Sequence, residues 1–388
     1  MFHYQKTKSR HLLYACLLTV LTSTSFYATT SNICIDIQTK QIRLENEDSI
    51  RSFNNHYISK SKMDAFIQHQ MDSLHMPGLS IAFVNDGKIA YHNALGVTNI
   101  DSKQKVDSKS IFDAASMSKT VFSFFTLKMI DDGLLNLDTP LYNYMEYPDI
   151  AYDPRYKLIT ARMVLSHTSG FPNWRFLDQQ GNYNPNNKLT ILFEPGTKFQ
   201  YSGEGYEYLA NVIAHLKGVK KNELQDIIKN EIFEPLHMNN SSFVWNDYIQ
   251  KHRVDGHFNG KVNKGYSNSA KDPNFKASAS LQTESKAYAN FLIGIMNSKI
   301  LSKKSFNELL KIQSISLATK KSKKRNYGLG IVIEESTYGL NYSHGGDNLS
   351  NTALYMFNQE NKVGYVFFTN SENRNKFNKN LIDFLLKQ

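Results

Sequence analysis

The chain has 388 residues, of which 41% are hydrophobic and 21% are charged, as in a globular protein that can bury a sizeable core. Its formal net charge of +10 favours acidic surroundings, such as envelope polymers or anionic lipid at a membrane surface. The sequence contains no nucleic-acid-binding module, so we expect no nucleic-acid partner.

The N-terminus has the plan of a secretory signal peptide. Three basic side chains precede an apolar run at residues 12–21, and threonine, serine and alanine follow the run. The run is too short to span a bilayer comfortably, which favours a cleaved signal at residues 1–28 over an uncleaved anchor. Cleavage after Ser25 or Ala28 would lower the formal charge by three, to +7, because it removes Lys6, Lys8 and Arg10.

The two cysteines are compatible with export. Cys16 lies inside the predicted signal, so Cys34 would be the one cysteine of the mature chain. This excludes an internal disulfide and a thiolate metal cluster, and it fits a periplasmic, secreted or cell-envelope product of a bacterium. Residues 29–58 are polar and lack clear periodicity, so we interpret them as a linker or an N-terminal arm.

Hydrophobic periodicity predicts strands near both ends of the chain and helices between them. A helix over 63–74 ends at Pro77-Gly78, and a β-hairpin of strands 79–84 and 89–95 turns at Asp86-Gly87. Further predicted helices begin at Ser116 and lie at 160–165, 206–216, 222–232 and 283–296. The predicted C-terminal elements are strands at 328–333, 352–357 and 363–368 and a helix at 376–386.

This order predicts an α+β domain over residues 59–388. Strands from both chain ends would form an antiparallel sheet flanked by helices, with a helical region inserted between the two sets of strands.

Ser116 and Lys119 stand three residues apart, a spacing that places two side chains on one face of a helix. A serine hydroxyl beside a deprotonated lysine amine can be an activated nucleophile. The same S-x-x-K pattern occurs at Ser59 and Ser102, but only Lys119 precedes a long apolar run, which predicts a buried helix with Ser116 on its first turn. The alternative is an N-terminal helix serine with a solvated lysine.

Tyr201 lies in a loop that begins with the turn at Pro195-Gly196 and leads into the helix predicted from Tyr206. A tyrosine held there can move a proton if a nearby cation lowers its pKa. The alternative is a packing tyrosine in a chain that contains 22 of them.

His344-Gly345-Gly346 precedes the strand predicted from residue 352. The two glycines allow the backbone to approach a ligand closely, and a strand edge there could supply one oxyanion N–H, with the N–H of Ser116 as the other. His344 would sit in the cleft as a donor or a cation. The alternative is a glycine turn with an exposed histidine.

Together, the stretches Ser116-Met-Ser-Lys119, Tyr201-Ser-Gly203 and His344-Gly-Gly346 resemble the motifs of the serine β-lactamase/penicillin-binding-protein family, in the family's order. The resemblance is greatest to the branch of class C β-lactamases, D,D-carboxypeptidases and related esterases. It spans about residues 60–388 and implies a β-lactamase/transpeptidase-like fold. Four supporting stretches are also similar: 165–170, 193–196, 235–238 and 327–330.

The resemblance implies a role for each matched residue. Ser116 would be the acylated nucleophile, Lys119 its base, and Tyr201 the proton relay to the leaving group and from water. His344 would occupy the place of the lysine in the family's third motif. Beyond Gly346, Asp347 would offer the second oxyanion N–H from its backbone. No metal or cofactor would be needed.

Two departures from the family's pattern bear on the substrate. Members that cleave lactams and peptides usually carry asparagine where this chain has Gly203, and lysine where it has His344. Both changes resemble the esterase-like members. His167, in contrast, belongs to a loop that is structural in the family, and no G-x-S-x-G elbow is present to support a Ser-His-Asp triad.

The sequence therefore predicts an exported serine hydrolase that acts through an acyl-enzyme on an ester or a D-amino-acid-linked envelope substrate. The alternatives are a D,D-carboxypeptidase or β-lactamase, and a non-catalytic binding or sensor protein that retains the fold.

Overall fold

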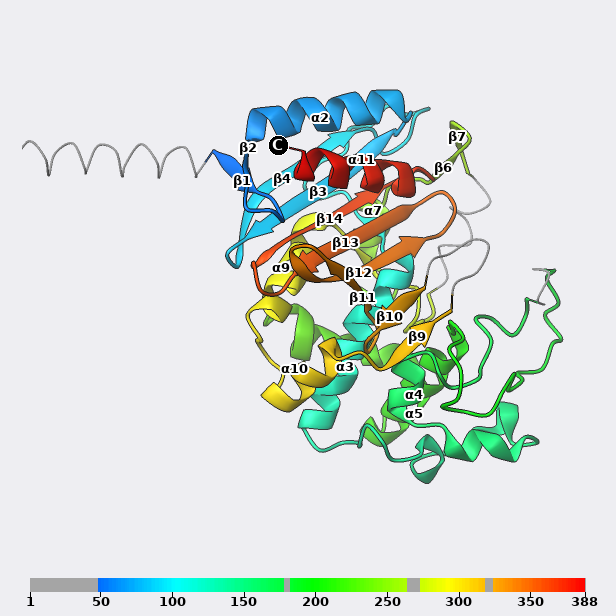
Figure 1. The fold of residues 1–388 in the computed structure, drawn as a ribbon. Coiled ribbons are helices and arrows are strands. Elements are labelled where there is room, and N and C mark those ends of the chain that lie inside the picture. Colours follow the sequence, from blue (N-terminus) through cyan, green and yellow to red (C-terminus); the bar gives the residue numbers. More distant parts are fainter. Residues whose placement is uncertain (1–47, 178–181, 264–272, 318–323, 388) are drawn as a thin grey trace, which may run out of the picture. The chain divides into compact units, whose positions relative to one another are not determined.

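An eight-stranded antiparallel sheet forms the centre of the fold, in the order β4-β3-β14-β13-β12-β11-β10-β9 (Figure 1). Its strands are β3 (Gly78–Asn85), β4 (Lys88–Gly96), β9 (Ser314–Ser316), β10 (Arg325–Tyr327), β11 (Val332–Ser336), β12 (Gly339–Asp347), β13 (Thr352–Asn358) and β14 (Val363–Thr369). The first hairpin joins the C-terminal strands where β3 pairs with β14, with Ala82 opposite Val366. The predicted sheet built from both chain ends is thus confirmed.

The computed structural model describes residues 48–177, 182–263, 273–317 and 324–387. The predicted signal peptide and most of the predicted arm lie outside these residues. The described residues from Ile50 onward belong to one compact unit.

Alternation along the strands separates two faces of the sheet. Leu79, Ile81 and Phe83 of β3 pack with α2 (Lys60–Ser73) and α11 (Arg374–Leu386) on one face. Ala82 and Val84 point to the other face, where the larger core lies. The two helices on the first face touch each other through the stacked rings of Phe66 and Phe384, 4.2 Å apart. The result is a helix–sheet–helix arrangement (Figure 1).

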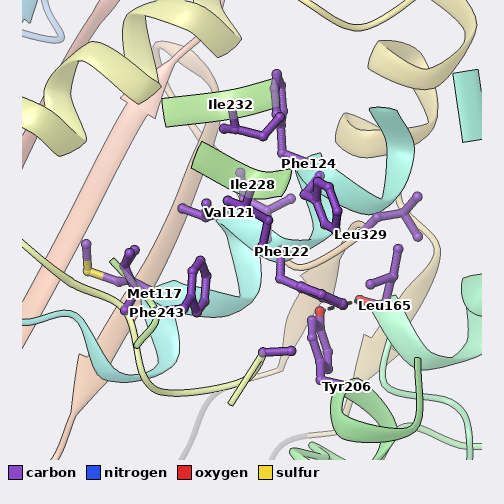
Figure 2. Close-up of a cluster of buried hydrophobic side chains, with 14 of the residues drawn as sticks. Met117, Val121, Phe122, Phe124, Leu165, Tyr206, Ile228, Ile232, Phe243 and Leu329 are labelled. Atoms are coloured by element: carbon purple, nitrogen blue, oxygen red, sulfur yellow. Dashed lines mark hydrogen bonds between the residues drawn. The ribbon is translucent and has the colours of Figure 1, made fainter. Parts of the chain in front are cut away.

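The other face is covered mainly by α3 (Ser118–Asp131) and α9 (Ser285–Met296). Helix α3 is buried on nearly all sides, as its apolar sequence predicts (Figure 2). Phe122 and Phe124 of α3 lie among side chains from distant segments, including Leu165 and Tyr206, and the Tyr206 hydroxyl donates a 3.3 Å hydrogen bond to the Leu165 carbonyl. This packing holds the start of α3 in a fixed position.

The inserted region is helical, as predicted, and contains short strands as well. Its helices are α4 (Ala161–Leu165), α5 (Glu204–Lys217), α6 (Leu224–Ile228), which continues as a π-helical turn over Lys229–Phe233, and α7 (Asp247–His252). Its short strands are β5 (Phe112–Asp113), paired with β8 (Gln282–Thr283), and β6 (His257–Phe258), paired with β7 (Lys261–Val262).

Several elements differ from the sequence-based prediction. Strands β9 and β10 were not predicted, because they have three residues each and are mostly polar. Helix α10 (Lys303–Leu310) was also not predicted. Strand β12 was not predicted because serine, asparagine and glycine interrupt its alternation. The arm prediction is wrong for residues 50–58, since Ile50, Phe53 and Ile58 are buried with α2. Strands β1 (Ser49–Arg51) and β2 (Tyr57–Ser59) lie there.

In the part of the chain that the structure describes, no helix has the length and apolar character needed to cross a membrane. Within the same residues, no group of three or more His, Cys, Asp or Glu side chains could hold a metal ion.

Candidate active site

Ser116 lies in a tight turn directly before α3. It belongs to a 3-10 turn over Ala115–Met117 that leads directly into α3, whereas the sequence predicts Ser116 on the first turn of the helix itself. Ala115 has a φ of 45°, a left-handed conformation that is uncommon for a residue with a side chain. Asp113 stabilises this turn by accepting a 3.2 Å hydrogen bond from the Ala115 N–H at Oδ1. Ser116 remains half-buried while its neighbours on both sides are buried. The turn thus presents the serine side chain at the edge of the core.

Lys119 is buried, with 1% of its surface exposed. Its Nζ lies 3.4 Å from Ser116 Oγ and 2.9 Å from the carbonyl oxygen of Ser278. The described residues supply no carboxylate in an ion pair with Lys119. Ser278 is held in turn by Glu207, whose Oε1 accepts a 3.1 Å hydrogen bond from the Ser278 hydroxyl. The amine is therefore aimed at the Ser116 hydroxyl by a fixed carbonyl.

Burial separates this Ser/Lys pair from the two others with the same spacing. Lys62 and Lys105 are both exposed. Ser59 is the N-cap of α2, where its Oγ accepts a 3.3 Å hydrogen bond from the Lys62 N–H. Ser102 lies in an exposed turn. Only Ser116 and Lys119 combine the spacing with a buried amine.

Tyr201 lies beside Lys119, with its ring centroid 4.7 Å from Nζ. His167 packs against the Tyr201 ring at 4.3 Å between centroids, and its Nδ1 accepts a 3.1 Å hydrogen bond from the Ser202 N–H. Burial, together with the nearby Lys119, holds the pKa of His167 well below its usual range. His167 is thus a neutral support for the Tyr201 segment in this geometry.

Gly203 has no room for a side chain. A Cβ atom built there would lie 2.8 Å from the Asn173 carbonyl oxygen and 3.0 Å from Cη2 of Trp174. The Asn173 carbonyl also accepts a 3.0 Å hydrogen bond from the Gly203 N–H, so it cannot easily move away. The indole of Trp174 therefore borders the space into which a side chain at position 203 would project.

The His344-Gly345-Gly346 segment precedes the strand that begins at Thr352, as predicted, but it lies inside a strand of its own, β12. Gly346 packs against the chain just before the nucleophile, because a Cβ there would lie 2.1 Å from the Ala114 carbonyl oxygen. Strand β11 pairs with β12 only as far as Ser343, so β12 continues beyond the end of its neighbour. The structure thus brings the glycine motif and the Ser116 turn into contact.

The backbone pattern of β12 leaves the N–H of Asp347 on its open edge. Asp347 lies opposite Thr352 on β13, and in the following turn the Asn348 N–H donates to the Asn351 carbonyl at 3.0 Å. Hydrogen-bonded and non-bonded pairs alternate along an antiparallel ladder. The Asp347 N–H therefore points away from β13, toward the side where β11 has ended.

His344 is buried and engaged through both ring nitrogens. Nδ1 lies 2.9 Å from the Gly345 carbonyl oxygen, and Nε2 lies 2.7 Å from the Tyr327 hydroxyl. Since a carbonyl only accepts, Nδ1 carries the proton and Nε2 accepts from Tyr327. Burial and the nearby Lys119 lower the pKa of His344 to about 3. The expectation of His344 as a cation or a free donor in the cleft is therefore wrong.

Asp113 and Arg374 belong to the site but were not predicted from the sequence. Asp113 Oδ2 accepts a 2.8 Å hydrogen bond from Nδ2 of Asn348, while its Oδ1 holds Ala115. Arg374 donates a 2.6 Å hydrogen bond from Nη1 to the Gly346 carbonyl. No sequence signal marks these residues, because their contacts with Asn348 and with the Gly346 carbonyl join segments that are distant in the chain.

A pocket of about 560 Å³ opens beside Tyr201. Its walls come from residues 196–201 and from the sheet edge at β9, and its polar lining includes Lys198, Gln200 and Ser316. A substrate group can therefore extend from the Tyr201 side of the site.

The chain is similar in sequence to known proteins. The Beta-lactamase family model matches residues 63–388. Protein flp of Staphylococcus aureus (strain MRSA252) is 28% identical over 209 residues, which cover 51% of this chain and 41% of flp. The match thus spans less than half the length of that relative.

Two solved structures share the fold. EstCE1, described as a hydrolase with promiscuous acyltransferase activity, superposes with a TM-score of 0.72 and 16% identity, covering 84% of this chain and 97% of EstCE1. The D-alanine carboxypeptidase AmpC of Burkholderia cenocepacia gives a TM-score of 0.67 and 15% identity, covering 84% and 98%. The predicted β-lactamase/transpeptidase-like fold is confirmed by these matches.

Proposed function

Because this chain belongs to the Beta-lactamase family, we propose that it is a serine hydrolase that acts through an acyl-enzyme formed on Ser116. The observation that carries the proposal is the buried amine of Lys119, 3.4 Å from Ser116 Oγ and beside the Tyr201 ring. A nucleophile with an adjacent base and a further proton carrier is the arrangement that covalent catalysis requires.

In the proposed reaction, neutral Lys119 accepts the proton of Ser116 as Oγ attacks the carbonyl carbon of the substrate. Negative charge develops on the carbonyl oxygen, where the N–H groups of Ser116 and Asp347 would stabilise it. The bond between the carbonyl carbon and the oxygen of the leaving alcohol then breaks. Tyr201 delivers its hydroxyl proton to that oxygen and takes up the proton held by Lys119. Water, deprotonated along the same route, attacks the acyl-enzyme and releases the acid and Ser116.

We propose an ester or a D-amino-acid-linked envelope compound as the substrate. Gly203 offers no side chain to a substrate amide, and the space beside it is bordered by Trp174. His344 is neutral in this geometry and pairs with Tyr327, so it offers no charge to a substrate carboxylate. Both features disfavour lactams and amides relative to esters, while Ser116, Lys119 and Tyr201 are unaffected.

The test is a panel of p-nitrophenyl esters, a chromogenic cephalosporin and intact-mass analysis after a fluorescent penicillin. We expect ester turnover in the wild type, its loss in Ser116→Ala, and no loss in the matched control Ser102→Ala, in which the serine belongs to one of the two exposed Ser/Lys pairs. Faster turnover of the cephalosporin than of any ester would indicate a β-lactamase. Absence of turnover and of acylation in the folded protein would indicate a non-catalytic binding protein.

We also propose that the protein is exported and acts in the cell envelope, on the basis of the signal-like N-terminus and the excess of basic residues. Cell fractionation and N-terminal sequencing of the mature chain test this. A cytoplasmic protein that retains Met1 would contradict it.

A further inference from the structure

Arg374 is the first residue of α11, and its side chain reaches back to the site from the C-terminal helix. The side chain is only 15% exposed. Nη1 donates a 2.6 Å hydrogen bond to the Gly346 carbonyl, and Nη2 lies 3.5 Å from Oδ2 of Asp347. Burying a guanidinium is costly unless its hydrogen bonds are satisfied. These contacts therefore identify Arg374 as a specific partner of the Gly346–Asp347 peptide.

The absence of a side chain at Gly345 leaves room for the Arg374 guanidinium. A Cβ at Gly345 would lie 2.9 Å from Nη1 and 3.2 Å from Cζ of Arg374. Gly345 does not have a positive φ, so its backbone conformation does not require glycine. The space for the guanidinium explains glycine at position 345.

The carbonyl that Arg374 binds belongs to the peptide group that carries the Asp347 N–H. Every peptide bond in the described residues is trans, so the C=O of Gly346 and the N–H of Asp347 point in opposite directions. The pairing of Asp347 with Thr352 directs the N–H to the open edge of β12. Arg374 therefore binds the carbonyl oxygen of this peptide group, while its N–H faces the site.

The open edge of β12 explains why this hydrogen bond is needed. Strand β11 no longer pairs with β12 beyond Ser343, so the sheet holds the Gly346–Asp347 peptide only on its β13 side, where Gly346 lies opposite Ala353. Two consecutive glycines also give the segment more backbone freedom than other residues would. An oxyanion hole stabilises charge only when its donors are held in place before the reaction.

We infer that Arg374 is a positioning residue for the acyl-transfer reaction, which it supports by holding the Gly346 carbonyl so that the Asp347 N–H faces the developing oxyanion. The inference rests on the proposed function. Loss of a single oxyanion donor typically lowers kcat by about 10²–10³-fold, so we expect a misoriented donor to lower it by about 10–100-fold.

The kinetic test compares Arg374→Ala and Arg374→Gln with wild type on p-nitrophenyl acetate, which has no charge. We expect kcat to fall by about 10–100-fold while KM changes less than about threefold, because the donor acts in the transition state. Guanidinium at about 50 mM should restore part of the kcat of Arg374→Ala. Unchanged kcat would overturn the inference. A rise in KM confined to esters that bear a carboxylate would also overturn it, since it would mean that Arg374 contacts the substrate.

A control variant separates the carbonyl contact from a general effect on α11. Lys379→Ala, on the same helix, removes an exposed side chain that pairs with Asp383 and should leave both kcat and stability unchanged. Equal losses in Lys379→Ala and Arg374→Ala would indicate a general effect on α11 and would refute the inference.

A crystal structure of Arg374→Ala tests the inference without any turnover. We expect the Gly346–Asp347 peptide to be rotated or present in two orientations. An unchanged peptide would overturn the inference whatever the kinetics show. If the wild-type protein hydrolyses no ester and Ser116 is not acylated, the proposed function fails on its own, while the rotated peptide would still establish the positional role of Arg374.

Discussion

The Tyr327 hydroxyl donates a 2.7 Å hydrogen bond to Nε2 of His344, and both side chains are buried. From the sequence, we expect His344 to sit in the cleft as a donor or a cation. With Nδ1 engaged by the Gly345 carbonyl, the imidazole is a neutral structural part of β12. The site therefore has one buried basic amine, Lys119, and a neutral histidine near it.

Removing the Tyr327 hydroxyl should destabilise the protein. In Tyr327→Phe, Nε2 of His344 loses its partner in a buried position, which typically costs about 1–3 kcal/mol. Urea denaturation measures the loss. The control is Tyr57→Phe, whose side chain is 54% exposed and which should change stability by less than about 0.5 kcal/mol. An equal effect of the two substitutions would contradict the structural role of the pair.

Stability should fall as the pH decreases from 6.5. Burial lowers the pKa of His344 to about 3 and that of His167 well below its usual range, so the unfolded chain binds protons at these histidines that the folded chain does not. The stabilisation is complete above pH 6.5 and is lost as the pH approaches the folded-state pKa. Each histidine contributes a slope of about 1.4 kcal/mol per pH unit in this range.

Urea denaturation at pH 6.5 and pH 5 checks this dependence. His344→Gln replaces the imidazole by a neutral side chain that does not titrate. Its stability should therefore fall less steeply than that of the wild type, by about 1.4 kcal/mol per pH unit. The same slope in both proteins would show that His344 is not kept neutral by the fold.

Replacing Lys119 by arginine should abolish the proposed activity while keeping the positive charge. A guanidinium does not lose its proton in proteins, so it cannot serve as a base for Ser116. We expect ester turnover to fall by about 10²–10⁴-fold, the usual contribution of a general base. The matched control is Lys62→Arg in the exposed pair, which should turn over esters like the wild type. Retained activity in Lys119→Arg would exclude proton abstraction by Lys119.

Restoring the family's asparagine at position 203 should be unfavourable here. Gly203→Asn places a side chain against the Asn173 carbonyl and the Trp174 ring, and overpacking of this kind costs about 1–3 kcal/mol. Trp174→Ala in the same chain should recover part of the loss, since it leaves only the carbonyl contact. Thermal and urea denaturation of the single and double variants measure the coupling. The control is Gly218→Asn, at a helix end with open space and a φ of 67°, where asparagine is tolerated.

The predicted parts of the fold are those with regular hydrophobic patterns. The apolar runs of β3, β13 and β14 and the apolar spacing of α2 and α11 were sufficient to locate these elements. Strand β12 was not predicted from the sequence, because its pairing with β13 depends on the backbone, while its side chains include polar residues and glycines. Pairing partners outweighed local preference in this strand.

The candidate site was predictable to the extent that its chemistry lies in local motifs. The structure brings Ser116, Lys119 and Tyr201 together, as the motifs indicate, and their catalytic roles remain a prediction. The engagement of His344 with Tyr327 was not predicted, because burial and the contact between β10 and β12 arise only in the folded sheet. Asp113 and Arg374 could not be found, since Asn348 and the Gly346 carbonyl come next to them only in the folded chain.

The pairing of β3 with β14 has a consequence for the order of events during synthesis. Phe83 of β3 lies opposite Tyr365 of β14, so β3 cannot pair with β14 until almost the whole chain has left the ribosome. Until then β3 has an unpaired edge with apolar residues, which invites association with other chains. Pairing over such a sequence distance also makes the closing step of folding slow. The nucleophile turn and the edge of β12 can thus meet only late, and a nascent chain that ends before β14 carries no complete site.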